Sequence, residues 1–213
     1  MMKLQPTSNV YKIVEFILIF ILAPISFAFN YAVQIKTVIG VLGLLYILFV
    51  LFKIERLKVR KPNLTQLKKY FTIILIRGLV IIITTIIFVW FTDKNVLFYV
   101  PQNNPRLWGI ILFVYSFFSV FPQELMYRTF YFSRYKSIFK NTTWLIFINA
   151  LVFSIAHVLF KNTLVLLITF IGGLLFALSY YKTKSTMYVT LEHAIYGCWL
   201  FTVGMGDMLG FPS

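Results

Sequence analysis

The sequence has few charged residues for its length. Only 12% of its 213 residues are charged, whereas a soluble domain carries about 25%. Hydrophobic residues make up 60% of the chain. This composition excludes an ordinary soluble domain. It predicts an all-α, polytopic membrane protein, because each membrane-crossing helix needs roughly 20 mainly apolar residues.

Cysteine is almost absent as well. Cys198 is the single cysteine, which excludes a disulfide within the chain and a cysteine metal cluster. The sequence also lacks an internal repeat, a low-complexity segment and a Gly/Ser-rich linker. We therefore expect one membrane domain over residues 1–213, built as a helix bundle.

Seven apolar stretches are long enough to be membrane spans. They are residues 13–30, 36–52, 71–91, 107–133, 144–160, 163–181 and 187–203. The fourth is too long for one straight crossing and has Pro122 near its middle, so a kink or two successive helices are expected, and the span count is seven or eight. The first follows Lys3 and Lys12 like a signal peptide, but no small-residue cleavage pattern follows it, which favours a retained span.

The basic residues predict the orientation in the membrane. The net charge is +14, and the segment 53–70 has seven lysines and arginines against one acidic residue, Glu55. By the positive-inside rule this loop and the N-terminus are expected in the cytoplasm. The charge is thus assigned to topology and to contact with the lipid bilayer, with no nucleic-acid partner. A role in attracting anionic lipid is the weaker alternative.

Ionisable residues within the apolar stretches indicate a site, because each costs at least ~2.5 kcal/mol to insert. The two histidines of the chain, His157 and His193, are among them, together with Glu124. At 1.5 Å of rise per residue all three lie roughly 10–20 Å from the cytoplasmic ends of their stretches. A joint site is favoured over three separate residues that each hold two helices together.

The neighbours of these residues extend the candidate site. Arg128 lies four residues after Glu124, on the same helix face, and could pair with it. Glu192 precedes His193 and could supply a second carboxylate. A glutamate with a histidine can deprotonate a water while a second histidine stabilises an oxyanion. Alternatively, His157, His193 and Glu124 could bind zinc, or the residues could relay protons in a transporter.

Three short motifs resemble those of a known family. They are QELMYR at 123–128, FSIAH at 153–157 and HAIYG at 193–197. Their order, on three late helices, is similar to that of the CPBP intramembrane proteases, which include the type II CAAX prenyl endopeptidases and the bacterial Abi proteins. The resemblance covers residues 107–203 and implies a CAAX-protease-like core.

The resemblance also implies a function. We expect an intramembrane endopeptidase of glutamic type, with a water-activating site open to the cytoplasm and a membrane-associated peptide or protein as substrate. Glu124, His157, His193 and Arg128 would be catalytic, with Gln123, Glu192 and Phe153 in supporting positions. No cofactor is expected, and zinc is the minority alternative. The family also suggests a bacterial plasma membrane.

Two positions depart from the family pattern. Gln123 stands where the family has the first of two glutamates, and Gly197 stands where it has an asparagine or a similar residue. These departures leave three interpretations of the function. In the first, Glu124 serves as the base. In the second, Glu192 supplies the carboxylate, and in the third the protein is a non-catalytic immunity or scaffold protein.

Overall fold

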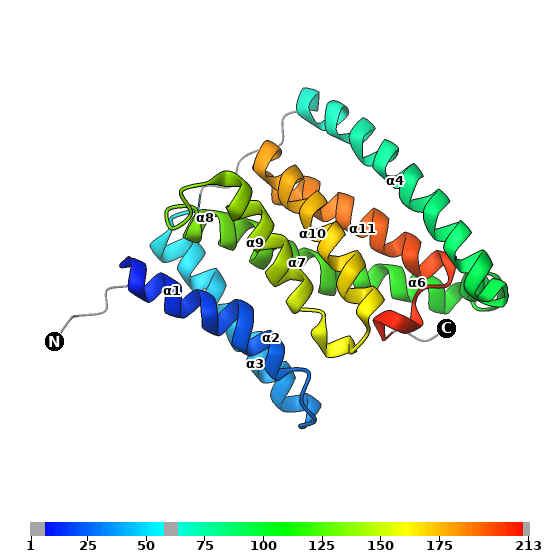
Figure 1. Ribbon diagram of the computed structural model, residues 1–213, viewed down its shortest axis with the longest axis horizontal. Helices are drawn as coiled ribbons and strands as arrows, with labels where there is room; N and C mark the ends of the chain where they lie inside the picture. The colour runs from blue at the N-terminus through cyan, green and yellow to red at the C-terminus, as the bar shows by residue number, and fades with distance from the viewer. Residues whose placement is uncertain (1–6, 58–63, 211–213) are drawn as a thin grey trace. The chain divides into compact units, whose positions relative to one another are not determined.

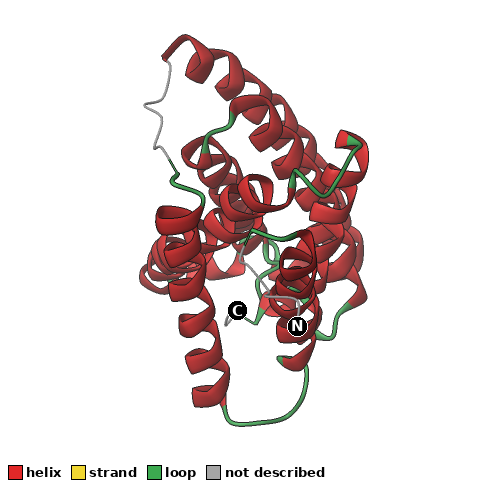
Figure 2. Ribbon diagram, turned by 90° about the vertical axis from the view of Figure 1, so that its left-hand side faces the viewer, coloured by secondary structure: helices red, strands yellow, loops and turns green. Residues whose placement is uncertain are grey.

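All the regular elements in the described part of the chain are helices (Figures 1 and 2). The structure is a computed structural model that describes residues 7–57 and 64–210, and this part contains no strand. The all-α prediction is therefore confirmed. The helices form two compact groups. The single membrane domain over 1–213 stays a prediction.

The first group comprises residues 1–59 and 125–181. Aromatic side chains fill its centre, where the fully buried Phe20 packs against Tyr127 and Tyr131 with ring centroids 5.2 and 5.8 Å apart. The elements of this group are α1 (Asn9–Ile17), η1 (Leu18–Leu22), α2 (Ala23–Ser26), α3 (Val33–Phe49), η2 (Val50–Ile54), η5 (Leu125–Phe130), α8 (Tyr131–Tyr135), α9 (Thr142–Ile155), η6 (Val158–Phe160) and α10 (Thr163–Thr183).

A buried ionic cluster joins three elements of the first group. Arg134 of α8 is fully buried and donates to Glu15 of α1, with Nη2 2.7 Å from Oε2. Its Nη1 donates to Glu55, just after η2, at 2.9 Å. The Tyr135 hydroxyl adds a hydrogen bond to Glu15. Because an unpaired buried charge is costly, this cluster fixes how α1 and α8 meet.

Helices α9 and α10 approach each other closely at a glycine. A Cβ built on Gly173 would lie only 3.0 Å from the Cα of Ala150. Small residues allow this kind of close backbone contact between membrane helices. The close approach of α9 and α10 therefore depends on the missing side chain at Gly173.

The second group comprises residues 60–124 and 182–213. Its long helix α4 packs along α11 (Figure 1), and Trp199 Nε1 of α11 donates to Thr85 Oγ1 of α4 at 2.8 Å. Helix α11 ends at Gly204, which has a φ of +102°. The elements are α4 (Leu64–Asp93), η3 (Lys94–Val96), α5 (Tyr99–Asn103), α6 (Pro105–Val114), η4 (Tyr115–Val120), α7 (Phe121–Glu124), α11 (Thr186–Val203) and η7 (Asp207–Leu209).

Six segments of the described chain are long and apolar enough to cross a membrane. They are Asn9–Ser26, Val33–Ile54, Lys68–Val96, Pro105–Tyr135, Thr142–Phe160 and Thr163–Thr183. The predicted seventh stretch does form a helix, α11, but it is less apolar because it carries Glu192 and His193. The count of seven or eight spans is thus not confirmed. Residues 58–63 of the predicted basic loop lie outside the described part, and the cytoplasmic N-terminus stays a prediction.

Candidate functional site

The first motif lies where regular α-helix gives way to wider π-helical turns. Pro122 and Glu124 belong to the short α7, which π-helix η4 precedes and π-helix η5 follows. Proline has no N–H to donate and its ring crowds the preceding turn, so the regular series of backbone hydrogen bonds is interrupted there. Short π-helical segments within α-helices are frequent at functional sites. The break in the helix expected near Pro122 therefore takes the form of π-helical turns on both sides of α7.

Glu124 and His193 are in direct contact within the second group. His193 Nδ1 lies 2.8 Å from Glu124 Oε1, although the residues are 69 positions apart in the sequence. Glu124 is fully buried and His193 is 6% exposed. An ionised carboxylate can only accept, and with Glu124 in that form the Nδ1–H of His193 donates the hydrogen bond. The ring Nε2 of a neutral His193 is then a proton acceptor.

Gln123, at the position of the family's first glutamate, makes a local contact instead. Its Nε2 donates to Ser119 Oγ at 2.8 Å, one turn earlier in the same helical segment. An ionised carboxylate has no N–H and could not donate this hydrogen bond. The carboxylate that reaches the histidine is therefore that of Glu124.

Glu192 has different partners from its neighbour His193. Arg77 of α4 donates to Glu192 Oε1 from Nη1 at 2.8 Å. Tyr196 donates to the same oxygen at 3.2 Å, and also to the Ile74 carbonyl at 3.0 Å. These contacts join α11 to α4. They favour a structural role for Glu192 over its use as the catalytic carboxylate.

Gly197, the departure in the third motif, lies against an aromatic ring. A Cβ built on Gly197 would overlap the Tyr115 hydroxyl and the adjoining ring carbons. The Tyr115 ring also meets His193 edge-on, with centroids 6.0 Å apart. Glycine is therefore required at 197 for Tyr115 to occupy this place.

The remaining candidates lie in the first group. Arg128 is fully buried, donates to Asn149 Oδ1 at 2.5 Å, and stands 4.7 Å from the centre of the Phe153 ring. Phe153 in turn contacts His157, with ring centroids 4.9 Å apart. His157 lies in the turn after α9, where its Nδ1 donates to the Phe153 carbonyl at 2.8 Å. The second motif therefore places Phe153 between Arg128 and His157.

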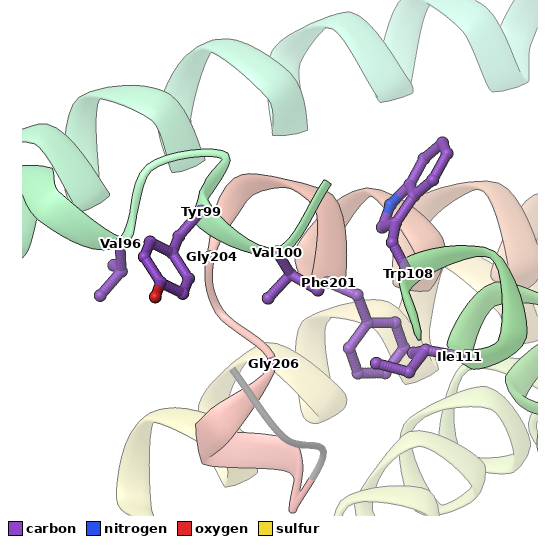
Figure 3. Close-up of a pocket in the computed structure, with 8 residues that line it drawn as sticks. All are labelled: Val96, Tyr99, Val100, Trp108, Ile111, Phe201, Gly204 and Gly206. Carbon is purple, nitrogen blue, oxygen red and sulfur yellow. The ribbon is translucent and has the colours of Figure 1, made fainter. Parts of the chain in front are cut away.

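A small apolar pocket lies elsewhere in the second group (Figure 3). Its walls include Phe201 and Ile111, which belong to the same apolar cluster as Tyr115. None of the residues that line it is acidic, basic or a histidine. Among the described residues, moreover, no set of three histidine, cysteine or acidic side chains is gathered as metal ligands would be.

The comparisons with known proteins bear on the segment that contains all three motifs. Residues 105–199 match the profile of the family described as type II CAAX prenyl endopeptidase Rce1-like. This segment is similar to the Rce1-like family. The match covers a little under half of the chain and confirms the resemblance to CPBP proteases. No curated protein and no solved structure gave a significant match.

The similarity to the Rce1-like family supports several predictions at a coarse level. The family is one of intramembrane proteases, and the apolar helices fit an integral membrane protein with a peptide or protein substrate. The structure brings Glu124 to His193, and Arg128 and His157 to Phe153. The pairing of Glu124 with Arg128, and the joining of His157 to the Glu124–His193 pair, stay predictions.

Sequence reasoning missed three residues that contact the candidates. Arg77 and Asn149 each had a usable signal, because they are isolated polar side chains within apolar stretches. Tyr115 had none, since a tyrosine among aromatic residues looks like ordinary packing.

Proposed function

We propose that the protein is an intramembrane endopeptidase that hydrolyses a peptide bond in a membrane-associated peptide or protein. The observation that carries the proposal is the buried hydrogen bond between Glu124 and His193 within the Rce1-like segment. A carboxylate that holds a histidine in one tautomer is a recurrent device for activating a nucleophile.

In this mechanism the pair activates water. Glu124 accepts from His193 Nδ1, which leaves Nε2 to take a proton from a water as its oxygen attacks the carbonyl carbon. Glu124 then stabilises the imidazolium that forms. When the C–N bond breaks, Nε2 returns the proton to the leaving amine, giving a carboxylic acid and an amine. In this role His193 transfers the proton and does not stabilise the oxyanion.

His157 and Arg128 support the same reaction in this proposal. Because His157 Nδ1 donates to the Phe153 carbonyl, a neutral ring has an acceptor at Nε2 that can orient the attacking water. Arg128 is held by Asn149 and by the face of Phe153, and it would position Glu124 as the first motif predicts. Gln123 and Glu192 have supporting roles only.

Hydrolysis by purified protein in detergent tests the proposal. The probes are an internally quenched peptide ending in a prenylated CAAX sequence, the same peptide without the prenyl group, and a set of short membrane peptides read by mass spectrometry. We expect Glu124→Ala, His157→Ala and His193→Ala each to lower kcat by about 10²–10⁴ fold, the usual contribution of acid–base catalysis. Gln123→Ala is the matched control, because it changes the adjacent residue.

Two outcomes would contradict the proposal. One is the absence of cleavage of every probe by the wild-type protein, and the other is cleavage unaffected by the three substitutions.

The non-catalytic alternative predicts instead that biological function survives Glu124→Gln. Zinc, as the minority alternative, would be held by His157, His193 and Glu124, and it predicts that a chelator removes activity and added zinc restores it.

A further inference from the structure

The space above Gly197 is filled by a tyrosine from another helix. Tyr115 is the first residue of η4, and its hydroxyl lies where a side chain at position 197 would begin. In the family pattern, this third-motif position carries an asparagine-type side chain. The chain thus has a hydrogen-bonding group at this place, but the group comes from position 115.

Tyr115 is held firmly by its surroundings. It is only 9% exposed, and its ring meets Phe201 edge-on with centroids 4.7 Å apart. The His193 ring also meets it edge-on, with centroids 6.0 Å apart. A group held in this way needs little rearrangement during a reaction, which is what an effective oxyanion donor requires.

The hydroxyl of Tyr115 is a polar group at the edge of an apolar cluster. Ile111, Val120 and Phe201 form an apolar cluster with Tyr115, and a phenylalanine would fill the same space without a polar atom. Gly197 lies four residues after His193, so both face the same side of α11, separated by about 6 Å along the helix. A substrate carbonyl attacked beside His193 is therefore within range of the Tyr115 hydroxyl.

We infer that Tyr115 is a catalytic residue that donates a hydrogen bond to the oxyanion and replaces the side chain that Gly197 lacks. The inference rests on the proposed proteolysis. As water adds to the carbonyl carbon, the C=O π electrons move onto oxygen, and the Tyr115 O–H donates to that oxygen without giving up its proton. When the C–N bond breaks, the electron pair returns to form the carbonyl of the product.

Steady-state hydrolysis by Tyr115→Phe tests the inference. The variant keeps the ring and removes the hydroxyl, so we expect kcat to fall by about 10²–10³ fold, as when one oxyanion donor is lost, with KM nearly unchanged. Tyr131→Phe is the matched control. It removes a buried tyrosine hydroxyl that donates to the Leu145 carbonyl, and its kcat should stay at the wild-type value.

A second variant tests the replacement of one donor by another. Tyr115→Ala vacates the space beside Gly197, and Tyr115→Ala/Gly197→Asn places an amide there. We expect the double variant to be at least tenfold faster than Tyr115→Ala, about the effect of a partly restored donor. A double variant no faster than the single one would contradict the replacement.

The results separate this inference from the proposed function. Wild-type protein that cleaves no probe would overturn both. Cleavage that depends on Glu124 but proceeds equally fast in Tyr115→Phe would overturn the role of Tyr115 alone. An equal fall of kcat in Tyr115→Phe and Tyr131→Phe would also overturn it, because both would then act through the fold.

Discussion

The ion pair between Arg77 and Glu192 gives a prediction that separates a structural carboxylate from a catalytic one. Only 1% of the Glu192 side chain is exposed, and its Oε1 accepts from Arg77 at 2.8 Å. Arg77→Met would leave this carboxylate in the apolar interface between α4 and α11. Tyr196 would remain as a donor, but it carries no charge.

The magnitude follows from the burial of the two partners. Removing one partner of a buried pair costs about 3–5 kcal/mol, and the low end applies because 24% of the Arg77 side chain is exposed. For a chain of this length, about 3 kcal/mol corresponds to a fall in Tm of roughly 6–12 °C. Glu192→Gln should cost only about 1 kcal/mol, because the partly exposed arginine can turn its head group toward a polar region.

Thermal unfolding of purified protein in detergent, followed by tryptophan fluorescence, measures these effects. The double variant Arg77→Met/Glu192→Gln should recover most of the Tm lost in Arg77→Met, since no buried charge remains. Arg106→Met is the matched control. Arg106 is exposed, so its loss should change stability by less than about 0.5 kcal/mol.

Two results would refute this reasoning. One is a fall in Tm of less than about 2 °C for Arg77→Met, which would be under 1 kcal/mol for a chain of this size. The other is a double variant no more stable than Arg77→Met. Should Glu192→Gln abolish hydrolysis while the fold is retained, Glu192 rather than Glu124 would be the catalytic carboxylate.

Three further predictions concern the other buried contacts. Glu124→Gln should lower kcat by about 10² fold or more, whereas Gln123→Ala should lower it less than about tenfold, as hydrolysis assays on the two variants would reveal. Gly173→Ala should destabilise the protein by about 1–3 kcal/mol through overpacking against α9, and Gly172→Ala, whose Cβ would meet only a ring of its own helix, should have the smaller effect in thermal unfolding. Arg134→Leu should cost about 3–5 kcal/mol by stranding two carboxylates, and an unchanged Tm would contradict the buried cluster.

Hydropathy and length were enough to predict most of the helices. Apolar stretches such as 36–52 and 163–181 correspond to the segments Val33–Ile54 and Thr163–Thr183, because a membrane helix must satisfy its backbone internally and cover itself with apolar side chains. The same signal fails for α11, where polar residues that face protein lower the hydropathy. The π-helical turns around Pro122 were also beyond prediction, since they depend on how neighbouring side chains pack.

The candidate site was predictable only where the sequence marks it by an unusual residue. A histidine or glutamate in an apolar stretch is such a mark, and it led to Glu124 and His193. Spacing could not reveal that Arg77, 115 residues away, meets Glu192. Tyr115 is a harder case, because its importance arises from an absent side chain at Gly197. That Tyr115 occupies the space beside Gly197 can be seen only in the folded structure.

The partners of the buried carboxylates provide a physical reason to place the chemistry at Glu124. In the described part of the chain, Glu15, Glu124 and Glu192 are the buried acidic residues. Glu15 and Glu192 contact arginines, whose charge is permanent at any pH relevant to the protein. Such pairs hold helices together but cannot move a proton. Glu124 contacts a histidine, the side chain whose charge changes most readily near neutral pH. We therefore propose that proton transfer during hydrolysis takes place at His193, which Glu124 contacts.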